Sequence, residues 1–402
     1  MRRITLLLAS AALVACTDDG TALPAAVAGG PDANVDAAAA APVPIPAFMP
    51  AASVFVDGHQ YDDVYANCRT GYCRHNENTE MIAWNGAIWL VHRSAISQDL
   101  GPNSALHVYK STDHGQSFQQ TAFIDAPSDR DIRDPSFFIV GKQLYLKVLE
   151  RLHPSGSGAR DTGVDTITAV KTSSDGATWT DGQVVAPHGW SFWRVKENAG
   201  IYYSAAYQDG DQQVVLFTSH DGLSWTMGPQ VYGISADTPL ETELTFMPGG
   251  KLLALVRMDG NDNELLGDQG RLRTKICWAD PPAYSSFSCP SEFDGQRLDG
   301  PVSFFWSSRL FVVARKHLQG TGKKRTSLFE ILGDFNGGAL TIQEWGELPS
   351  AGDTSYAGIA MTDSSHAVVS WYSGDLQADR PWVLGMFDLT SIWLGTIDFS
   401  RL

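Results

Sequence analysis

A short turn motif that occurs three times places the strongest constraint on how this chain can fold. The copies are Ser111–Phe118, Ser173–Trp179 and Ser219–Trp225, and each combines Ser-x-Asp with a glycine, a small hydroxylated residue and an aromatic residue. We expect the aspartate to accept backbone N–H groups, the glycine to adopt a positive φ and the aromatic side chain to return to the core. A hairpin turn repeated in this way predicts repeated small sheets, as in a β-propeller.

The rest of the chain divides into six similar units, each with a polar cluster followed by two apolar strands. The units begin near Arg74, Asp131, His188, Glu241, Asp299 and Asp353. Starts separated by about 55 residues suit a four-stranded blade with its loops. The sequence therefore predicts an all-β, six-bladed β-propeller, or a seven-bladed one if residues 51–80 hold further sheet. We expect a strand near Val54–Val56 to close the ring by pairing with the last blade.

The N-terminal residues predict export from the cell. Arg2 and Arg3 precede an apolar run, residues 4–14, that is too short to span a bilayer. A basic start, a short apolar stretch and small residues before a cleavage point are typical of a signal peptide. The ending Leu-Val-Ala-Cys resembles a bacterial lipobox, which implies lipidation at Cys16, and the alternative is ordinary secretion with cleavage nearby.

Three segments follow from this division. Residues 1–16 are expected to be the signal peptide, and residues 51–402 the propeller domain. Between them, residues 17–50 are rich in Ala, Pro, Gly and Asp, a composition that cannot build a core, and they predict a disordered tether. The expected location is the bacterial cell envelope, with membrane attachment through the lipid alone.

Four further cysteines lie in two close pairs, which predicts two local disulfides in an exported chain. The pairs are Cys68 with Cys73 and Cys277 with Cys289. A zinc site is the alternative, but neither spacing fits a familiar zinc motif. The formal net charge of −16 disfavours nucleic acid as a partner. A few arginines in a cleft can still bind one anionic sugar, and we expect a monomer without metal or cofactor.

The six unit starts also predict where chemistry occurs, because the first strand of each propeller blade begins near the central axis. Arginine binds carboxylates, carboxyl groups act as acids and bases, and aromatic rings stack on sugars. The candidate substrate-binding residues at the strand starts and at the ends of second strands are Arg74, His75, Glu77, His92, Arg133, Trp190, Trp193, Arg194, Arg257, Arg315 and Asp353. The sequence therefore predicts a glycan or oligosaccharide as the partner.

The three turns resemble the Asp-boxes of the sialidase superfamily, and a second segment extends the resemblance. Glu241 is followed sixteen residues later by Arg257, at the end of the next expected strand, as in sialidases. The resemblance implies that Glu241 polarises a nucleophilic tyrosine, for which Tyr356 is the candidate. It also implies that Arg257 and Arg315 bind a substrate carboxylate.

The same resemblance implies an acid/base aspartate before the first Asp-box, where Asp99 stands, with Asp134 as the other candidate. An arginine opening the first strand matches Arg74, although the family's Arg-Ile-Pro is here Arg-His-Asn. The chain is most similar to bacterial sialidase-like, BNR-repeat proteins. The segments that carry this likeness are Arg133-Asp134-Pro135, Trp193-Arg194, Glu241-Thr242, Gly300-Pro301 and Gly352-Asp353-Thr354-Ser355-Tyr356.

Three functions follow as expectations. The first is hydrolysis that releases a terminal, acidic sugar from a glycan. The second is a lyase acting on a uronate polysaccharide, with His75 or His92 as base and Tyr356 as acid. The third is a propeller that binds glycans without catalysis, since fold does not imply function.

Overall fold

The computed structural model describes residues 45–98, 102–125, 127–153, 166–208, 212–260 and 271–402. Within these ranges the chain is almost entirely β-structure, with one four-residue α-helix, α1 (Trp382–Gly385), and short 3₁₀ turns. None of the helices in these ranges is long and apolar enough to cross a membrane. Cys16 and Asp99 lie outside the described residues.

Four antiparallel sheets contain four consecutive strands each. The first comprises β6 (Arg130–Val140), β7 (Gln143–Leu152), β8 (Thr166–Ser173) and β9 (Gln183–Val184). The second comprises β10 (Trp190–Asn198), β11 (Ile201–Gln208), β12 (Gln213–Ser219) and β13 (Trp225–Tyr232). The third comprises β14 (Pro239–Phe246), β15 (Leu252–Met258), β16 (Arg273–Ala279) and β17 (Phe287–Asp294). The fourth comprises β18 (Asp299–Trp306), β19 (Arg309–Leu318), β20 (Lys323–Gly333) and β21 (Leu340–Glu347).

The fifth sheet has eight strands and joins the two ends of the domain. One half comprises β2 (His75–Trp84), β3 (Ala87–Ala95), β4 (Ser104–Ser111) and β5 (Gln119–Asp125). The other comprises β22 (Thr354–Met361), β23 (His366–Gly374), β24 (Thr390–Asp398) and β1 (Ala51–Val56). The two halves meet at one parallel pair, His75 with Thr390.

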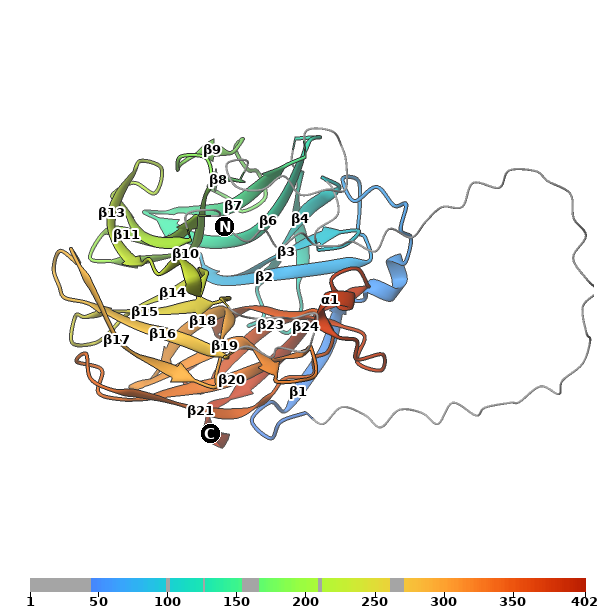
Figure 1. Cartoon of the computed structure of the whole chain (residues 1–402). Helices are drawn as coiled ribbons and strands as arrows, with labels where there is room; N and C mark the ends of the chain where they lie inside the picture. The colour runs from blue at the N-terminus through green and yellow to red at the C-terminus, as the bar shows by residue number, and fades with distance from the viewer. Residues whose placement is uncertain (1–44, 99–101, 126, 154–165, 209–211, 261–270) are drawn as a thin grey trace, which may run out of the picture. The chain divides into compact units, whose positions relative to one another are not determined.

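Strand β1 pairs with β24, so an N-terminal strand completes the last part of the sheet, as predicted for Val54–Val56 (Figure 1). Between β1 and β2 the structure adds a 3₁₀ turn, Gly58–Tyr61, and no further strand. The described strands form four four-stranded sheets and one eight-stranded sheet, which is neither the six separate blades predicted nor the seven of the alternative. Phe48 and Met49, assigned to the tether, are buried against β24 and its neighbours. The folded body therefore begins a few residues earlier than position 51.

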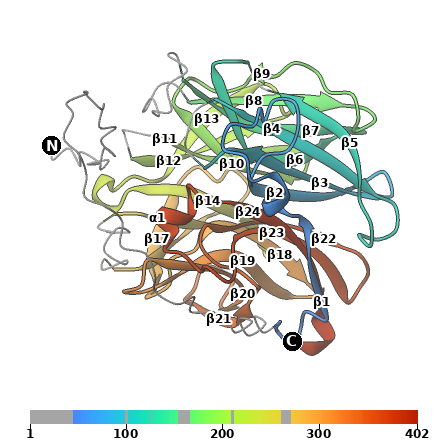
Figure 2. The same cartoon turned by 90° about the vertical axis from the view of Figure 1, so that its right-hand side faces the viewer.

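The hydrophobic core lies between neighbouring sheets. Apolar residues of β3 pack with those of β6 and β7, and those of β11 and β12 pack with β14 and β15. Further clusters join β15 to β19 and β19 to β23. Because each sheet packs its faces on the sheets before and after it, the arrangement is propeller-like (Figure 1 and Figure 2).

The three Ser-x-Asp turns connect β4 to β5, β8 to β9 and β12 to β13, which are the third and fourth strands of three four-stranded sets. In the second copy, Asp175 accepts the N–H groups of Ala177 and Thr178, each at 2.8 Å, and Gly176 has φ of 75°. The glycine also lies against Trp89 of β3, where a Cβ atom would come within 2.1 Å of the ring. The turn chemistry expected from the motif is therefore present, and it adds a contact to the preceding sheet.

Both predicted disulfides are present. Cys68 is bonded to Cys73 in the segment before β2, and Cys277 of β16 is bonded to Cys289 of β17. Each disulfide is therefore local, joining residues within one loop or one hairpin.

Candidate functional site

The first strand of every four-stranded set has a break in its ladder close to its start. The residues in these breaks are 78–79, 134–135, 193–194, 240–241, 300–301 and 356–357. Four of the breaks contain a residue with positive φ, namely Asn78, Asp134, Gly300 and Tyr356. Bulges re-aim side chains, and positive φ in non-glycine residues is a form of strain that clusters at functional sites.

Tyr356 and Glu241 form the centre of the site. The Tyr356 hydroxyl donates to Glu241 Oε1 at 2.5 Å, and both residues are buried. Arg257 Nη1 donates to Glu241 Oε2 at 2.7 Å and to the Tyr356 hydroxyl at 3.2 Å. Gly300 N–H donates to the same Glu241 Oε2 at 3.0 Å. The tyrosine oxygen therefore has a carboxylate and a guanidinium in direct contact.

Two further predicted residues surround the Tyr356 ring. The Arg315 guanidinium carbon lies 5.2 Å from the ring centroid, and Trp193 packs edge-on at a centroid distance of 5.7 Å. Trp193 Nε1 donates to the Pro301 carbonyl at 3.2 Å, which fixes the orientation of the indole. Residues from four separate sheets thus meet at one tyrosine.

A small pocket with a cavity volume of about 10 Å³, roughly the space of one water molecule, lies beside this tyrosine. The residues that line it are Asn78, Thr79, Asp134, Pro135, Ser136, Lys147, Trp193, Arg194 and Tyr356. Asp134 accepts a hydrogen bond from Asn78, and its backbone carbonyl accepts one from Lys147 Nζ at 2.6 Å. The pocket is therefore lined by a carboxyl group, a tyrosine and an indole, and its volume is far below the roughly 300 Å³ at which ligand pockets usually begin.

Protein carboxylates surround both arginines of the site. Arg257 makes a two-pronged contact with Asp259, at 2.6 and 2.9 Å, and lies 3.1 Å from Asp299. Arg315 lies 3.3 Å from both Asp299 and Asp353. A substrate carboxylate that reached these guanidinium groups would share them with protein carboxylates.

A second part of the same ionic network lies on β2, β3 and β6. Arg93 pairs with Glu77 and also donates to Asp131 Oδ1, from Nη2 at 2.7 Å and from Nε at 2.9 Å. Arg133 Nε donates to Asp131 Oδ2 at 2.6 Å. Of the predicted residues, Glu77 and Arg133 therefore belong to a buried chain of alternating charges.

His75 connects the two parts of the network. Its Nε2 lies 3.5 Å from Glu77 Oε2 and 3.5 Å from Asp353 Oδ2. Burial lowers the pKa of His75, but the neighbouring Asp353 and Glu77 carboxylates raise it to about 9. A histidine in this state is a poor general base at neutral pH.

Burial also changes the chemistry of Tyr356 and Lys147. Burial and the Glu241 carboxylate raise the pKa of Tyr356 well above its usual value, against the opposing effect of Arg315 and Arg257. The phenol therefore stays protonated at rest. Burial lowers the pKa of Lys147 to about 8, with Asp134 and Glu241 acting in the opposite direction.

Three predicted residues lie away from the pocket, and a fourth, Arg194, lines it. His92 is stacked on His107 and hydrogen-bonded to Tyr109, because neighbouring strand residues face opposite sides and Arg93 takes the network position. Trp190 is a core residue packed on Phe217, so of the two tryptophans only Trp193 lines the pocket. Arg74 pairs with Asp62 and Asp388. Arg194 lines the pocket, and its guanidinium pairs with Glu80 and donates to the Ala357 carbonyl.

Sequence reasoning did not select Arg93, Asp131, Lys147, Asp259 and Asp299 as site residues. A signal for two of them, Arg93 and Asp299, was present, because Glu77–Arg93 and Asp299–Arg315 have the same sixteen-residue spacing as Glu241–Arg257. In the structure Glu77 lies directly across from Arg93, and Asp299 from Arg315, on a first and second strand. Glu241 lies in the ladder break of β14, and its side chain pairs with Arg257. A carboxylate followed by an arginine at this spacing is therefore a repeated feature of this chain.

The sequence matches no protein-family model and no curated protein. Among solved structures, a protein of unknown function from Dyadobacter fermentans is similar with a TM-score of 0.59 and 16% identity, over 87% of this chain and all of that one. NanB sialidase from Streptococcus pneumoniae has a TM-score of 0.61 and 10% identity, over 87% of this chain and 71% of that one.

Trypanosoma rangeli sialidase, solved in complex with sialic acid, is similar with a TM-score of 0.54 and 13% identity. The match covers 81% of this chain and 54% of that enzyme, so the chain spans about half the length of the trypanosomal protein. Identities this low carry information about the fold rather than the activity. Together with the sheet arrangement, these comparisons show that the chain has a sialidase-like, propeller-like fold.

Proposed function

We propose that this chain is a glycan-active propeller that hydrolyses a terminal, acidic sugar, with Tyr356 as the nucleophile. The observation that carries the proposal is the 2.5 Å hydrogen bond from the Tyr356 hydroxyl to Glu241, with Arg257 at 3.2 Å from the same oxygen. A weak nucleophile held against a base is the arrangement that covalent catalysis requires. The sialidase-like fold supports the glycan as substrate.

In the proposed reaction, the Tyr356 oxygen attacks the anomeric carbon while Glu241 takes the phenolic proton. The bond to the leaving sugar oxygen breaks, and a carboxylic acid protonates that oxygen. Asp134 lines the same pocket as Tyr356 and is one candidate for this acid. Asp99, which lies outside the described residues, is the other candidate. Water then hydrolyses the tyrosyl intermediate, with the acid acting as base.

A tyrosine suits an acidic sugar better than a second carboxylate would. A neutral phenol avoids bringing another negative charge against an anionic anomeric centre. Arg257 lies close enough to stabilise the charge that develops on the phenolic oxygen. Arg257 and Arg315 would bind the substrate carboxylate, with Arg194 at the edge of the pocket.

The proposal treats the domain as six blades. The two halves of the eight-stranded sheet share a single parallel residue pair, which is a weak connection compared with the long antiparallel ladders inside each half. Counting the halves separately gives six four-stranded blades. The six ladder breaks would then lie at equivalent positions around one axis.

A non-catalytic glycan-binding role is the second candidate. It is favoured by the carboxylates that already contact Arg257 and Arg315, and by the small size of the pocket. A lyase is less favoured, because His75 faces two carboxylates and His92 is stacked among aromatic rings.

We also propose that the protein is exported and lipid-anchored at Cys16, and that it acts as a monomer. The two disulfides fit an oxidising compartment. Incorporation of labelled palmitate into the full chain, and its loss in Cys16→Ser, would support the anchor. Equal labelling of both proteins would contradict it.

The test of the function is sugar release from a panel of acidic glycans by the full chain. Tyr356→Phe and Glu241→Gln are each expected to reduce kcat by about 100-fold or more. Tyr232→Phe is the matched control, because its hydroxyl also bonds a carboxylate, Asp237, at 2.5 Å, but it lies in another part of the domain. Wild-type turnover in both site variants would contradict hydrolysis through Tyr356. Tight glycan binding without any turnover would favour the binding role.

A further inference from the structure

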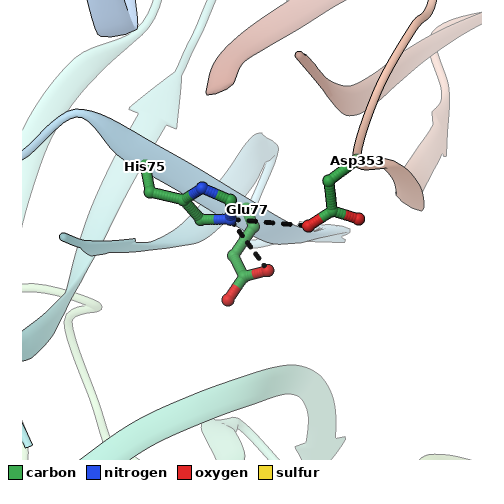
Figure 3. A group of neighbouring side chains, drawn as sticks. All are labelled: His75, Glu77 and Asp353. Atoms are coloured by element: carbon green, nitrogen blue, oxygen red, sulfur yellow. Dashed lines mark ion pairs between the residues drawn. The ribbon is translucent and has the colours of Figure 1, made fainter. Parts of the chain in front are cut away.

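Three buried polar atoms face one another at the start of β2 and just before β22, and none has a hydrogen-bond partner among the described residues. They are His75 Nε2, Glu77 Oε2 and Asp353 Oδ2, and all three residues are fully buried. The three atoms lie within 4.8 Å of one another (Figure 3). Leaving one buried polar atom unsatisfied is costly, so three that point to a common centre indicate a missing ligand.

The remaining polar atoms of the same side chains are held in place from behind. His75 Nδ1 donates to the Asp388 carbonyl at 2.7 Å, since a carbonyl oxygen can only accept. The other ring nitrogen, Nε2, is therefore turned toward the centre. Arg93 binds the other oxygen of Glu77. Asp353 Oδ1 accepts from the Tyr372 hydroxyl and from Trp382 Nε1, each at 2.9 Å. Metal-binding histidines and carboxylates are oriented by such outer partners.

The separations fit a small metal ion. Bonds of about 2.0–2.2 Å at tetrahedral angles place neighbouring ligand atoms about 3.4 Å apart. His75 Nε2 is 3.5 Å from each of the two carboxylate oxygens. One imidazole nitrogen with two carboxylate oxygens suits first-row divalent ions, whereas Ca²⁺ and Mg²⁺ prefer sites made of oxygen alone.

We propose that His75, Glu77 and Asp353 bind one first-row divalent cation, such as Zn²⁺ or Mn²⁺. The ion would join β2 to the residue that precedes β22, where the two halves of the eight-stranded sheet meet. Asp353 also contacts Arg315, which lies over the Tyr356 ring, so the ion would fix one wall of the candidate active site. This role is structural and stands independently of the hydrolysis proposed above.

The test is the metal content of the untagged full chain, refolded with EDTA or with ZnCl₂, MnCl₂, CaCl₂ or MgCl₂. We expect one equivalent of zinc or manganese by mass spectrometry. Relative to the EDTA sample, the melting temperature is expected to rise by about 5 °C or more at saturating metal. Calcium and magnesium should give neither result.

The single variants His75→Gln, Glu77→Gln and Asp353→Asn are expected to lose the bound metal. His317→Gln is the matched control, because His317 is also a buried histidine beside an aspartate, but both its ring nitrogens have partners, Asp299 and Lys324. Substoichiometric metal in the wild-type chain, with no shift in melting temperature, would overturn the proposal. In that case a proton on His75 Nε2, shared with the Glu77 and Asp353 carboxylates, would occupy the centre in place of a metal ion. The wild-type result decides the matter even if the variants do not fold.

Discussion

The Tyr356 hydroxyl donates a 2.5 Å hydrogen bond to Glu241, although 115 residues separate the two in sequence. Each residue lies in a ladder break, in β22 and β14 respectively. The break in β18 lies beside them, and its Gly300 contacts both residues. The dyad therefore depends on the backbone of three first strands and on close packing around one ring.

Gly300→Ala is expected to displace Tyr356. Gly300 has φ of 54°, and a Cβ atom there would lie 2.9 Å from the Tyr356 ring. Because a displacement of about 1 Å can cost roughly 100-fold in rate, we expect kcat for sugar release to fall by at least about tenfold. Gly295→Ala is the control, since Gly295 also has positive φ but open space around it. An unchanged kcat in Gly300→Ala would show that the position of Tyr356 does not matter.

The two tryptophans of β10 are expected to behave differently. Trp193→Phe removes an indole that lines the pocket beside Tyr356, so kcat/KM should fall by about tenfold with a small loss of stability. Trp190→Phe should lower the melting temperature through lost core packing and leave kcat/KM near the wild-type value. Steady-state kinetics and thermal unfolding of both variants check this. The reverse pattern would mean that the sugar contacts Trp190.

Gly176→Ala is expected to destabilise the domain. The new Cβ would overlap the Trp89 ring of the neighbouring sheet at 2.1 Å, in addition to the strain of φ near 75°. Overpacking and backbone strain together should cost about 3 kcal/mol of unfolding free energy. Gly200→Ala, at φ of 79° with nothing nearby, isolates the backbone part and should cost about 1 kcal/mol. Equal losses in urea unfolding would show that the contact with Trp89 is unimportant.

Because His92 is buried, we expect the free energy of unfolding to fall in mild acid. Burial lowers its folded-state pKa to about 4, below the unfolded value of about 6.5. The unfolded chain therefore binds more protons between these values, and the stabilisation present above pH 6.5 is lost as pH falls toward 4. The slope is about 1.4 kcal/mol per pH unit for each such histidine.

His107, whose pKa burial lowers to about 2, adds to the same slope. His92→Gln should therefore reduce the pH dependence of urea unfolding by roughly half between pH 6.5 and 5, above the range in which carboxylates such as Asp131 and Asp175 contribute. A slope identical to that of the wild-type chain would mean that His92 is protonated in the folded state.

Much of the strand order could be predicted from the sequence. The unit starts at Arg74, Asp131, Asp299 and Asp353 lie within a residue of the first residues of β2, β6, β18 and β22. Polar clusters and turn residues mark these positions because strands begin where the chain leaves a loop. The two disulfides could be predicted because each joins cysteines that are close in sequence. The pairing of β1 with β24 could be predicted because a propeller needs its last sheet to be completed by an N-terminal strand.

The direction of individual side chains could not be predicted in the same way. His92 and Arg93 are neighbours, and strand alternation sends only one of them toward the network. A ladder break reverses that alternation locally, so the side on which Tyr356 or Trp193 lies depends on the bulge. Likewise, the approach of His75 to Asp353 depends on tertiary structure, because the two residues come from opposite ends of the domain.

The central claim, that Tyr356 is the nucleophile, is tested most directly by trapping the glycosyl-enzyme. A 2,3-difluorosialic acid of the kind bound to Trypanosoma rangeli sialidase as a covalent intermediate is a suitable reagent. Incubation with the full chain followed by peptide mass spectrometry should show one added sugar on the peptide containing Tyr356, and none in Tyr356→Phe. A label on another residue, or sugar release without any label on Tyr356, would contradict the account.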